Sequence, residues 1–181
     1  MYQKVGVFLS SKSNLPASYE NAAQEVGEML GRTGRTLVYG GCRRGLMEVI
    51  AKAVKNAGGK VFGMVPDIIE ARGLVSEQID VEFRCVDLND RKAMMNNESD
   101  VLVALPGGIG TLDEAFTVLA AGIIGTQKRF LIFYNVDHCW DSLLAALDDL
   151  RARGLFTNAP ENHYAVVETV AELQALLDEG S

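Results

Sequence analysis

The sequence predicts a doubly wound α/β domain, in which helices cover both faces of a mainly parallel sheet. Short apolar runs alternate with helical patterns along the whole chain, so each strand is joined to the next through a helix. Such crossovers join parallel strands and are right-handed. The run Val-Leu-Val-Ala-Leu at residues 101–105 is apolar throughout, which is typical of a central parallel strand buried on both faces. Together these observations favour a Rossmann-like arrangement.

Strands are expected where apolar and β-branched residues form short runs that end in polar, glycine or proline residues. In chain order they fall at residues 5–9, 36–39, 60–65, 81–86, 101–105, 129–134 and 164–167.

Helices are expected where apolar residues recur every three or four positions, as Ala22, Val26, Met29 and Leu30 do in the first. In chain order they fall at residues 17–33, 45–56, 89–98, 112–121, 140–153 and 170–177. The stretch 67–80 follows neither pattern, and we expect a partly helical excursion there.

Length and composition fit one domain that covers residues 1–181. Hydrophobic residues make up 48% of the chain and charged residues 23%, as in ordinary globular proteins. A chain of this length buries about 70% of the surface that its unfolded form exposes, so it needs no disulfide or metal to fold. No repeat, linker or change of composition divides it.

The charge and the cysteines narrow the class of protein. With 17 Lys+Arg against 24 Asp+Glu, the formal net charge is −7, which argues against a nucleic-acid partner. A positive pocket for a small anion remains possible on an acidic surface. Three cysteines without C-x-x-C spacing suggest reduced thiols in a cytoplasmic protein. No apolar run approaches the roughly 18 residues of a membrane span, so no membrane partner is expected.

The loop that follows the buried run is the most informative segment. It reads Pro-Gly-Gly-Ile-Gly-Thr at residues 106–111 and precedes a helix. Glycines let a ligand approach the main chain, and a helix start offers free N–H groups and a positive dipole end. These features favour a phosphate site. The alternative is a tight turn, because Thr111 and Glu114 have the spacing of a capping box, which would account for both residues structurally.

Two further loops follow the strands expected at residues 5–9 and 36–39. Because they leave the carboxyl ends of these strands, they reach the same ligand crevice as the glycine loop. They contain Ser10 and the pair Gly40-Gly41. Arg91 and Lys92 open the helix before the buried strand. Cations at that end of a helix gain nothing from its dipole, which favours another role, although a solvated face is the alternative.

Other kinds of site lack their residues in the sequence. His138 and His163 have no metal-ligand spacing with the cysteines. No G-x-S-x-G nucleophile turn is present. We therefore expect neither a metal nor another cofactor.

The chain resembles the LONELY GUY (LOG) family of cytokinin riboside 5′-monophosphate phosphoribohydrolases. An older label for this family is "lysine decarboxylase-like". The resemblance runs from about residue 5 to residue 175. It is carried by three motifs: Gly40-Gly41…Gly45-Leu46-Met47, Arg91-Lys92-Ala93-x-Met95 and Pro106-Gly107-Gly108-x-Gly110-Thr111-x-x-Glu114.

The resemblance implies a cytoplasmic homodimer that hydrolyses the N-glycosidic bond of a nucleoside 5′-monophosphate, releasing the base and ribose 5-phosphate. It implies catalytic roles for Arg91 and Glu114. It places the 5′-phosphate against Gly107, Gly108, Gly110 and Thr111, and it puts Lys92 and Asp113 in segments that bind substrate. Ile109 of the same loop and the strand-end residues Ser10, Gly40 and Gly41 complete the expected substrate site. The base would be adenine or a prenylated adenine.

Two other functions compete with hydrolysis. A non-catalytic nucleotide-binding or carrier protein could use the same fold, and the presence of both Arg91 and Glu114 favours the enzyme. Amino-acid decarboxylation with pyridoxal phosphate, which the older label suggests, lacks a lysine in a recognisable Schiff-base context.

Overall fold

The computed structural model describes residues 1–126, 129–157 and 159–180. Within these residues seven strands form one sheet in the order β4-β3-β2-β1-β5-β6-β7. Every neighbouring pair is parallel. The strands are β1 (Lys4–Phe8), β2 (Thr36–Tyr39), β3 (Lys60–Pro66), β4 (Val81–Cys85), β5 (Val101–Ala104), β6 (Leu131–Tyr134) and β7 (Tyr164–Val167). The predicted doubly wound parallel sheet is confirmed.

The direction of the sheet order reverses between β1 and β5. From β1 the chain builds outward to β4, then returns to place β5 on the other side of β1 and continues to β7. The loops that follow β1 and β5 therefore leave the sheet in opposite directions. The crevice between them, at the carboxyl ends of the strands, is where such folds bind ligands.

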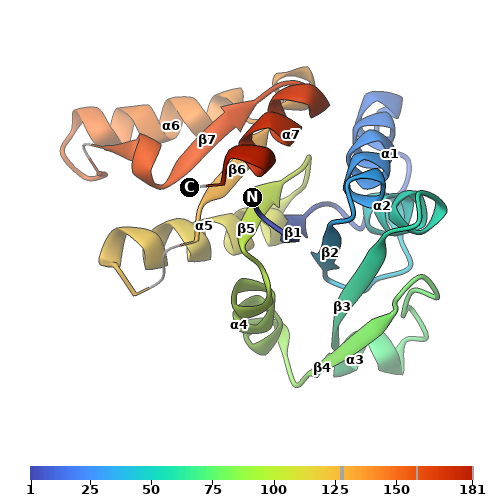
Figure 1. The fold of residues 1–181 in the computed structure, drawn as a ribbon. Coiled ribbons are helices and arrows are strands. Elements are labelled where there is room, and N and C mark those ends of the chain that lie inside the picture. Colours follow the sequence, from blue (N-terminus) through green and yellow to red (C-terminus); the bar gives the residue numbers. More distant parts are fainter. Residues whose placement is uncertain (127–128, 158, 181) are drawn as a thin grey trace.

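Helices cover both faces of the sheet (Figure 1). Apolar residues of α1 (Ala17–Arg32), α2 (Gly45–Asn56) and α7 (Val170–Glu179) join one core cluster. Residues of α4 (Leu88–Glu98), α5 (Ile109–Ile124) and α6 (Asp141–Ala152) join the other. The apolar run of β5 serves both clusters, because Val101 and Val103 point to one face and Leu102 and Ala104 to the other.

The predicted helix at residues 112–121 is longer than expected. It begins at Ile109 and ends at Ile124. Glycine has a low helix propensity, so Gly110 argued against a helix there. In the structure Gly108 is extended (φ −103°, ψ −150°) and is the last residue before the helix, and Gly110 lies inside its first turn.

The excursion at residues 67–80 is only briefly helical, as α3 (Asp67–Ala71) beside β4 (Figure 1). Beyond α3 it is fastened to the loop after β2. Arg43 N donates to Leu74 O at 2.7 Å, and Ser76 N donates to Gly41 O at 2.9 Å. Ser76 Oγ also donates to Glu48 Oε2, on the first turn of α2, at 2.6 Å. The excursion is therefore fixed over the β2–α2 loop.

None of the helices in the described part of the chain is long and apolar enough to cross a membrane.

Candidate active site

The carboxyl ends of β1 and β5 are joined directly at the point where the sheet order reverses. Leu105 N donates to Phe8 O at 2.9 Å, and Ser10 N donates to Pro106 O at 3.2 Å. These bonds bring the polar loop after β1 against the glycine loop after β5. Ser10 and the glycine loop that leads into α5 therefore lie side by side at the point where a ligand crevice is expected.

The glycine loop presents free main-chain donors at the start of α5. The first helical bond runs from Leu112 N to Gly108 O, so the N–H groups of residues 109–111 have no acceptor within the helix. Space is open around the α-carbons of Gly108 and Gly110. The side chain of Ile109 points outward and is 82% exposed. Such a helix start is suited to binding a phosphate.

The alternative of a capping box is wrong. The helix begins at Ile109, so Thr111 lies within its first turn rather than before it. Thr111 is buried and packs against the α-carbon of Gly107, where a side chain would collide with it. Glu114 therefore does not close a cap, and its carboxylate faces another helix.

Glu114 forms a buried ion pair with Arg91. The Nη2 of Arg91, on α4, donates to Oε1 of Glu114, on α5, at 2.5 Å. Their side chains are 13% and 4% exposed. Burial raises the pKa of Glu114 above its ordinary value, and the guanidinium of Arg91 opposes that rise. The arrangement joins a desolvated carboxylate to a planar cation close to the glycine loop.

Arg91 keeps donors for a ligand. Its Nε is buried and has no hydrogen-bond partner among the described residues. A methyl group at Gly40 would lie 3.3 Å from Nη1 of Arg91 and 3.3 Å from Cε of Met47. Glycine at position 40 thus leaves room for the guanidinium. Met47, which belongs to the motif Gly45-Leu46-Met47, lies beside the same glycine and comes from α2.

Lys92 and Asp113 pair with each other across the same two helices. Nζ of Lys92 lies 2.9 Å from Oδ1 and 2.8 Å from Oδ2 of Asp113. Lys92 is 15% exposed and Asp113 57%. Two ion pairs, at consecutive positions of each helix, therefore fix α4 against α5.

Ser10 and Gly41 take different positions. Ser10 is buried, and its Oγ accepts from Lys12 N at 3.1 Å, which shapes the loop after β1. Gly41 has a left-handed φ of +71° and faces Val65 and Ile79 rather than Arg91. The structure thus brings Gly40 to Arg91 and turns Gly41 towards the 67–80 excursion.

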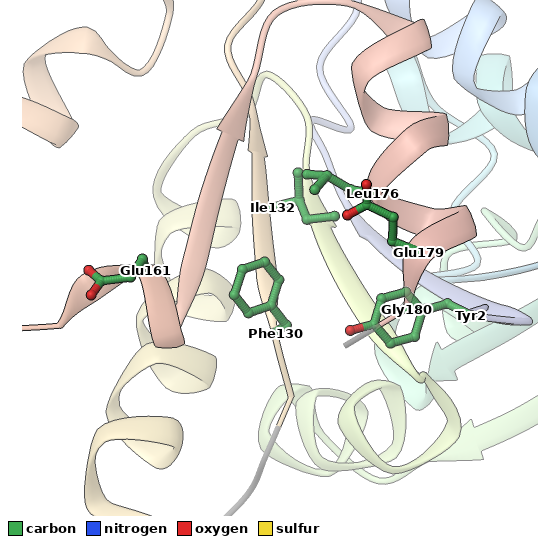
Figure 2. Close-up of a pocket in the computed structure, with 7 residues that line it drawn as sticks. All are labelled: Tyr2, Phe130, Ile132, Glu161, Leu176, Glu179 and Gly180. Carbon is green, nitrogen blue, oxygen red and sulfur yellow. The ribbon is translucent and has the colours of Figure 1, made fainter.

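A pocket of about 220 Å³ lies elsewhere, lined by Tyr2, Phe130, Ile132, Glu161, Leu176, Glu179 and Gly180 (Figure 2). Tyr2 precedes β1 and Phe130 precedes β6, so this pocket is at the amino ends of the strands. Its carboxylates, Glu161 and Glu179, would repel a phosphate. Among the described residues no group of three His, Cys, Asp or Glu side chains could hold a metal ion.

The fold and the site define a class: a Rossmann-like α/β protein with an open, glycine-rich helix start beside a buried arginine–carboxylate pair. A family model described as "Possible lysine decarboxylase" matches residues 47–177. The probable cytokinin riboside 5′-monophosphate phosphoribohydrolase LOGL5 of Oryza sativa subsp. japonica is 36% identical over 179 residues, 98% of this chain and 72% of that protein. The cytokinin riboside 5′-monophosphate phosphoribohydrolase LOG3 of Arabidopsis thaliana is 32% identical over 98% of this chain and 83% of its own length. The chain belongs to this LOG family.

A solved structure of the molybdenum cofactor carrier protein from Chlamydomonas reinhardtii also matches. It has a TM-score of 0.73 at 23% identity, over 99% of this chain and 98% of that one. At this identity the likeness concerns the fold.

Proposed function

We propose that the protein hydrolyses the N-glycosidic bond of a nucleoside 5′-monophosphate, with AMP or a cytokinin riboside monophosphate as the substrate. The observation that carries the proposal is the buried pair of Arg91 and Glu114 next to the free N–H groups of α5. Relatives of which the chain covers most of the length are named phosphoribohydrolases, which supports the same reaction.

The reaction breaks the bond between C1′ of the ribose and the base nitrogen. The bonding electrons leave with the base, which takes up a proton, and water adds its hydroxyl to C1′ to give ribose 5-phosphate. The transition state has oxocarbenium character at C1′. The carboxylate of Glu114 is the group that stabilises this positive charge and orients the water.

The surrounding residues position the substrate in this proposal. The main-chain N–H groups at residues 108–111 bind the 5′-phosphate, and Ser10 borders the same crevice. Arg91 uses its free Nε and Nη1 on phosphate or ribose oxygens while Nη2 holds Glu114. The Lys92–Asp113 pair links the two helices that carry Arg91 and Glu114, and both of its side chains contribute to substrate binding in this proposal.

A carrier that binds a nucleotide without cleaving it is the alternative, and carrier proteins with this fold exist. A carrier has no need for a desolvated carboxylate at the ribose end of the site. The pair at Arg91 and Glu114 therefore favours hydrolysis.

The deciding experiment incubates the protein with a panel of nucleoside 5′-monophosphates and measures free base and ribose 5-phosphate. We expect both products in equal amounts from at least one adenine nucleotide. Tight nucleotide binding without either product would favour the carrier.

We also propose a homodimer. Phe116, Ile123 and Ile124 are 42%, 42% and 75% exposed, and with Ala120 they form one apolar face of α5. A second copy of the chain would bury this face, since such patches mark interaction surfaces.

A cytoplasmic location is proposed from the thiols. Cys42, Cys85 and Cys139 are all unpaired, and the first two are buried. Burial raises the pKa of each of the three, which keeps them as neutral thiols of low reactivity. Unpaired cysteines are usual where the compartment is reducing.

A further inference from the structure

Trp140 is the only tryptophan of the chain, and it bonds to the strand that carries the glycine loop. It follows β6 and is 4% exposed. Its indole Nε1 donates to the carbonyl of Ala104 at 3.2 Å. Ala104 is the last residue of β5, two positions before Pro106. The indole therefore holds the end of the strand from which the phosphate loop departs.

The turn before Trp140 fixes the position of its backbone, and so of the indole that bonds to the Ala104 carbonyl. Asp137 and His138, in the turn between β6 and α6, have left-handed φ angles of 48° and 58°. Asn135, which is buried, accepts from Trp140 N at 2.8 Å. The same side chain donates to Asp141 Oδ1 at 2.8 Å. Asn135 thus fixes Trp140 through its backbone.

The ring is fixed as well. It packs edge-on against Phe133, with 5.8 Å between ring centroids and an interplanar angle of 62°. A buried side chain held at its backbone and its ring presents the indole N–H in one place. Because Ala104 is fully buried, its carbonyl has no access to water, and losing the indole would leave it without this donor.

The other side of the same strand end is held by β1. Leu105 N donates to Phe8 O, and the next carbonyl, Pro106 O, accepts from Ser10 N. The strand end therefore lies between β1 and β6, with Ala104 in register with Phe133 of β6, and the Trp140 indole adds a side-chain bond to this backbone pairing. The Trp140 bond is the one that a side-chain substitution can remove without changing the backbone.

We propose that Trp140 is a positioning residue for the phosphate site: its bond to Ala104 sets where β5 ends and so where the N–H groups of residues 108–111 point. This inference rests on the proposed function. Sites made of main-chain donors need placement to within about 0.5 Å, so a small shift of the strand end weakens the grip on phosphate. The indole touches neither the phosphate nor the sugar and acts through the loop.

The first test compares Trp140→Phe with Leu147→Ala. Phenylalanine keeps an aromatic ring in the cluster and removes only the indole donor. Leu147 is buried in the same cluster, on α6, and makes no bond to the strand end. We expect Trp140→Phe to raise KM for AMP and the Kd for ribose 5-phosphate about five-fold, the loss expected for one hydrogen bond. Leu147→Ala should lower Tm at least as much and leave both constants unchanged.

The second test needs no substitution. A protein with one tryptophan gives one indole N–H signal in a ¹H–¹⁵N spectrum. We expect that signal to exchange slowly with solvent, and to shift when AMP is added but not when adenosine is added, because only the phosphate engages the loop.

The inference is overturned if Trp140→Phe binds AMP and ribose 5-phosphate as the wild type does, or no more weakly than Leu147→Ala. An indole signal that AMP leaves unmoved would overturn it equally. Both outcomes are distinct from failure of the proposed function, in which the wild-type protein itself neither binds nor cleaves AMP.

Discussion

The guanidinium of Arg91, in the first turn of α4, and the carboxylate of Glu114, in the second turn of α5, stand 23 residues apart in the sequence and meet at 2.5 Å. Neither helix alone would hold its charge in so buried a place, since an unpaired buried charge is costly. The pair thus links α4 to α5. It also keeps the negative carboxylate of Glu114 beside the proposed ribose position.

Replacing Glu114 by glutamine separates charge from shape. Glutamine keeps an oxygen for Arg91 but cannot stabilise a positive C1′. We expect kcat to fall about 100-fold or more, a barrier increase of about 2.7 kcal/mol, with AMP still bound. Glu48→Gln is the matched control, because Glu48 is also poorly exposed and bonded but lies on α2. Steady-state kinetics and calorimetry on both variants check this; wild-type turnover in Glu114→Gln would leave the carboxylate with a structural role only.

Removing the charge of Arg91 should move the pH profile. Burial raises the pKa of Glu114 and Arg91 opposes the rise, so Arg91→Met should raise that pKa further. If Glu114 works as the ionised carboxylate, activity is lost as the pH falls through its pKa. With a higher pKa, this loss begins at a higher pH. We expect the acidic limb of kcat/KM to shift upward, in addition to a lower maximum. Arg44→Met, at an exposed arginine outside this pair, should leave the limb in place. An unshifted limb in Arg91→Met would assign it to another group.

The glycines of the loop should respond differently to alanine. Gly110 has open space around it and lies inside α5, so Gly110→Ala should keep or slightly raise Tm. Its methyl group would occupy the space proposed for phosphate, and KM for AMP should rise at least about ten-fold. Gly107→Ala should instead lower Tm, because the new methyl group meets Thr111.

The companion measurement compares AMP with adenosine. If the loop binds the phosphate, wild-type kcat/KM is much higher for AMP, and Gly110→Ala narrows the difference. Equal values for the two substrates in the wild type would remove the phosphate from this loop.

The apolar face of α5 should control assembly. Phe116→Asp places a charge in that face and should convert the proposed dimer to monomer in light scattering after size-exclusion chromatography. Leu155→Asp is the control, because Leu155 is 71% exposed but lies beyond the end of α6 and is not part of α5. A wild-type protein that elutes as a monomer at all concentrations would end the dimer proposal.

Much of the fold could be predicted from local pattern. The strand at β2 and the helix α2 have the bounds that periodicity gave them, because apolar spacing and the terminal glycines agree there. The start of α5 could not be predicted in the same way. Helix propensity places Gly110 outside a helix, whereas in the structure Gly110 lies in the first turn of α5. Because it has no side chain, the space beside its α-carbon is open.

The sequence singled out candidate site residues but could not show how they pair. Motif positions singled out Arg91, Lys92, Asp113 and Glu114, yet spacing within one helix suggested that Glu114 faced Thr111. The actual partners come from two helices, and only the packing of α4 against α5 decides them. The bond of Trp140 to Ala104 could not be predicted either, since no local pattern reveals a contact with a strand 36 residues earlier.

The pairing of β1 with β5 has a consequence for refolding. Backbone N–H of Lys4 donates to the carboxylate of Asp100, 96 residues away, where the two strands begin. Closing so long a loop costs entropy that nearby contacts do not repay, and chains dominated by such contacts fold slowly. The crevice exists only after this closure, because one of its walls follows each strand. We therefore expect enzymatic turnover to return later than helical circular dichroism when the denatured protein is diluted into buffer. Turnover would then time the moment at which the middle of the sheet is complete.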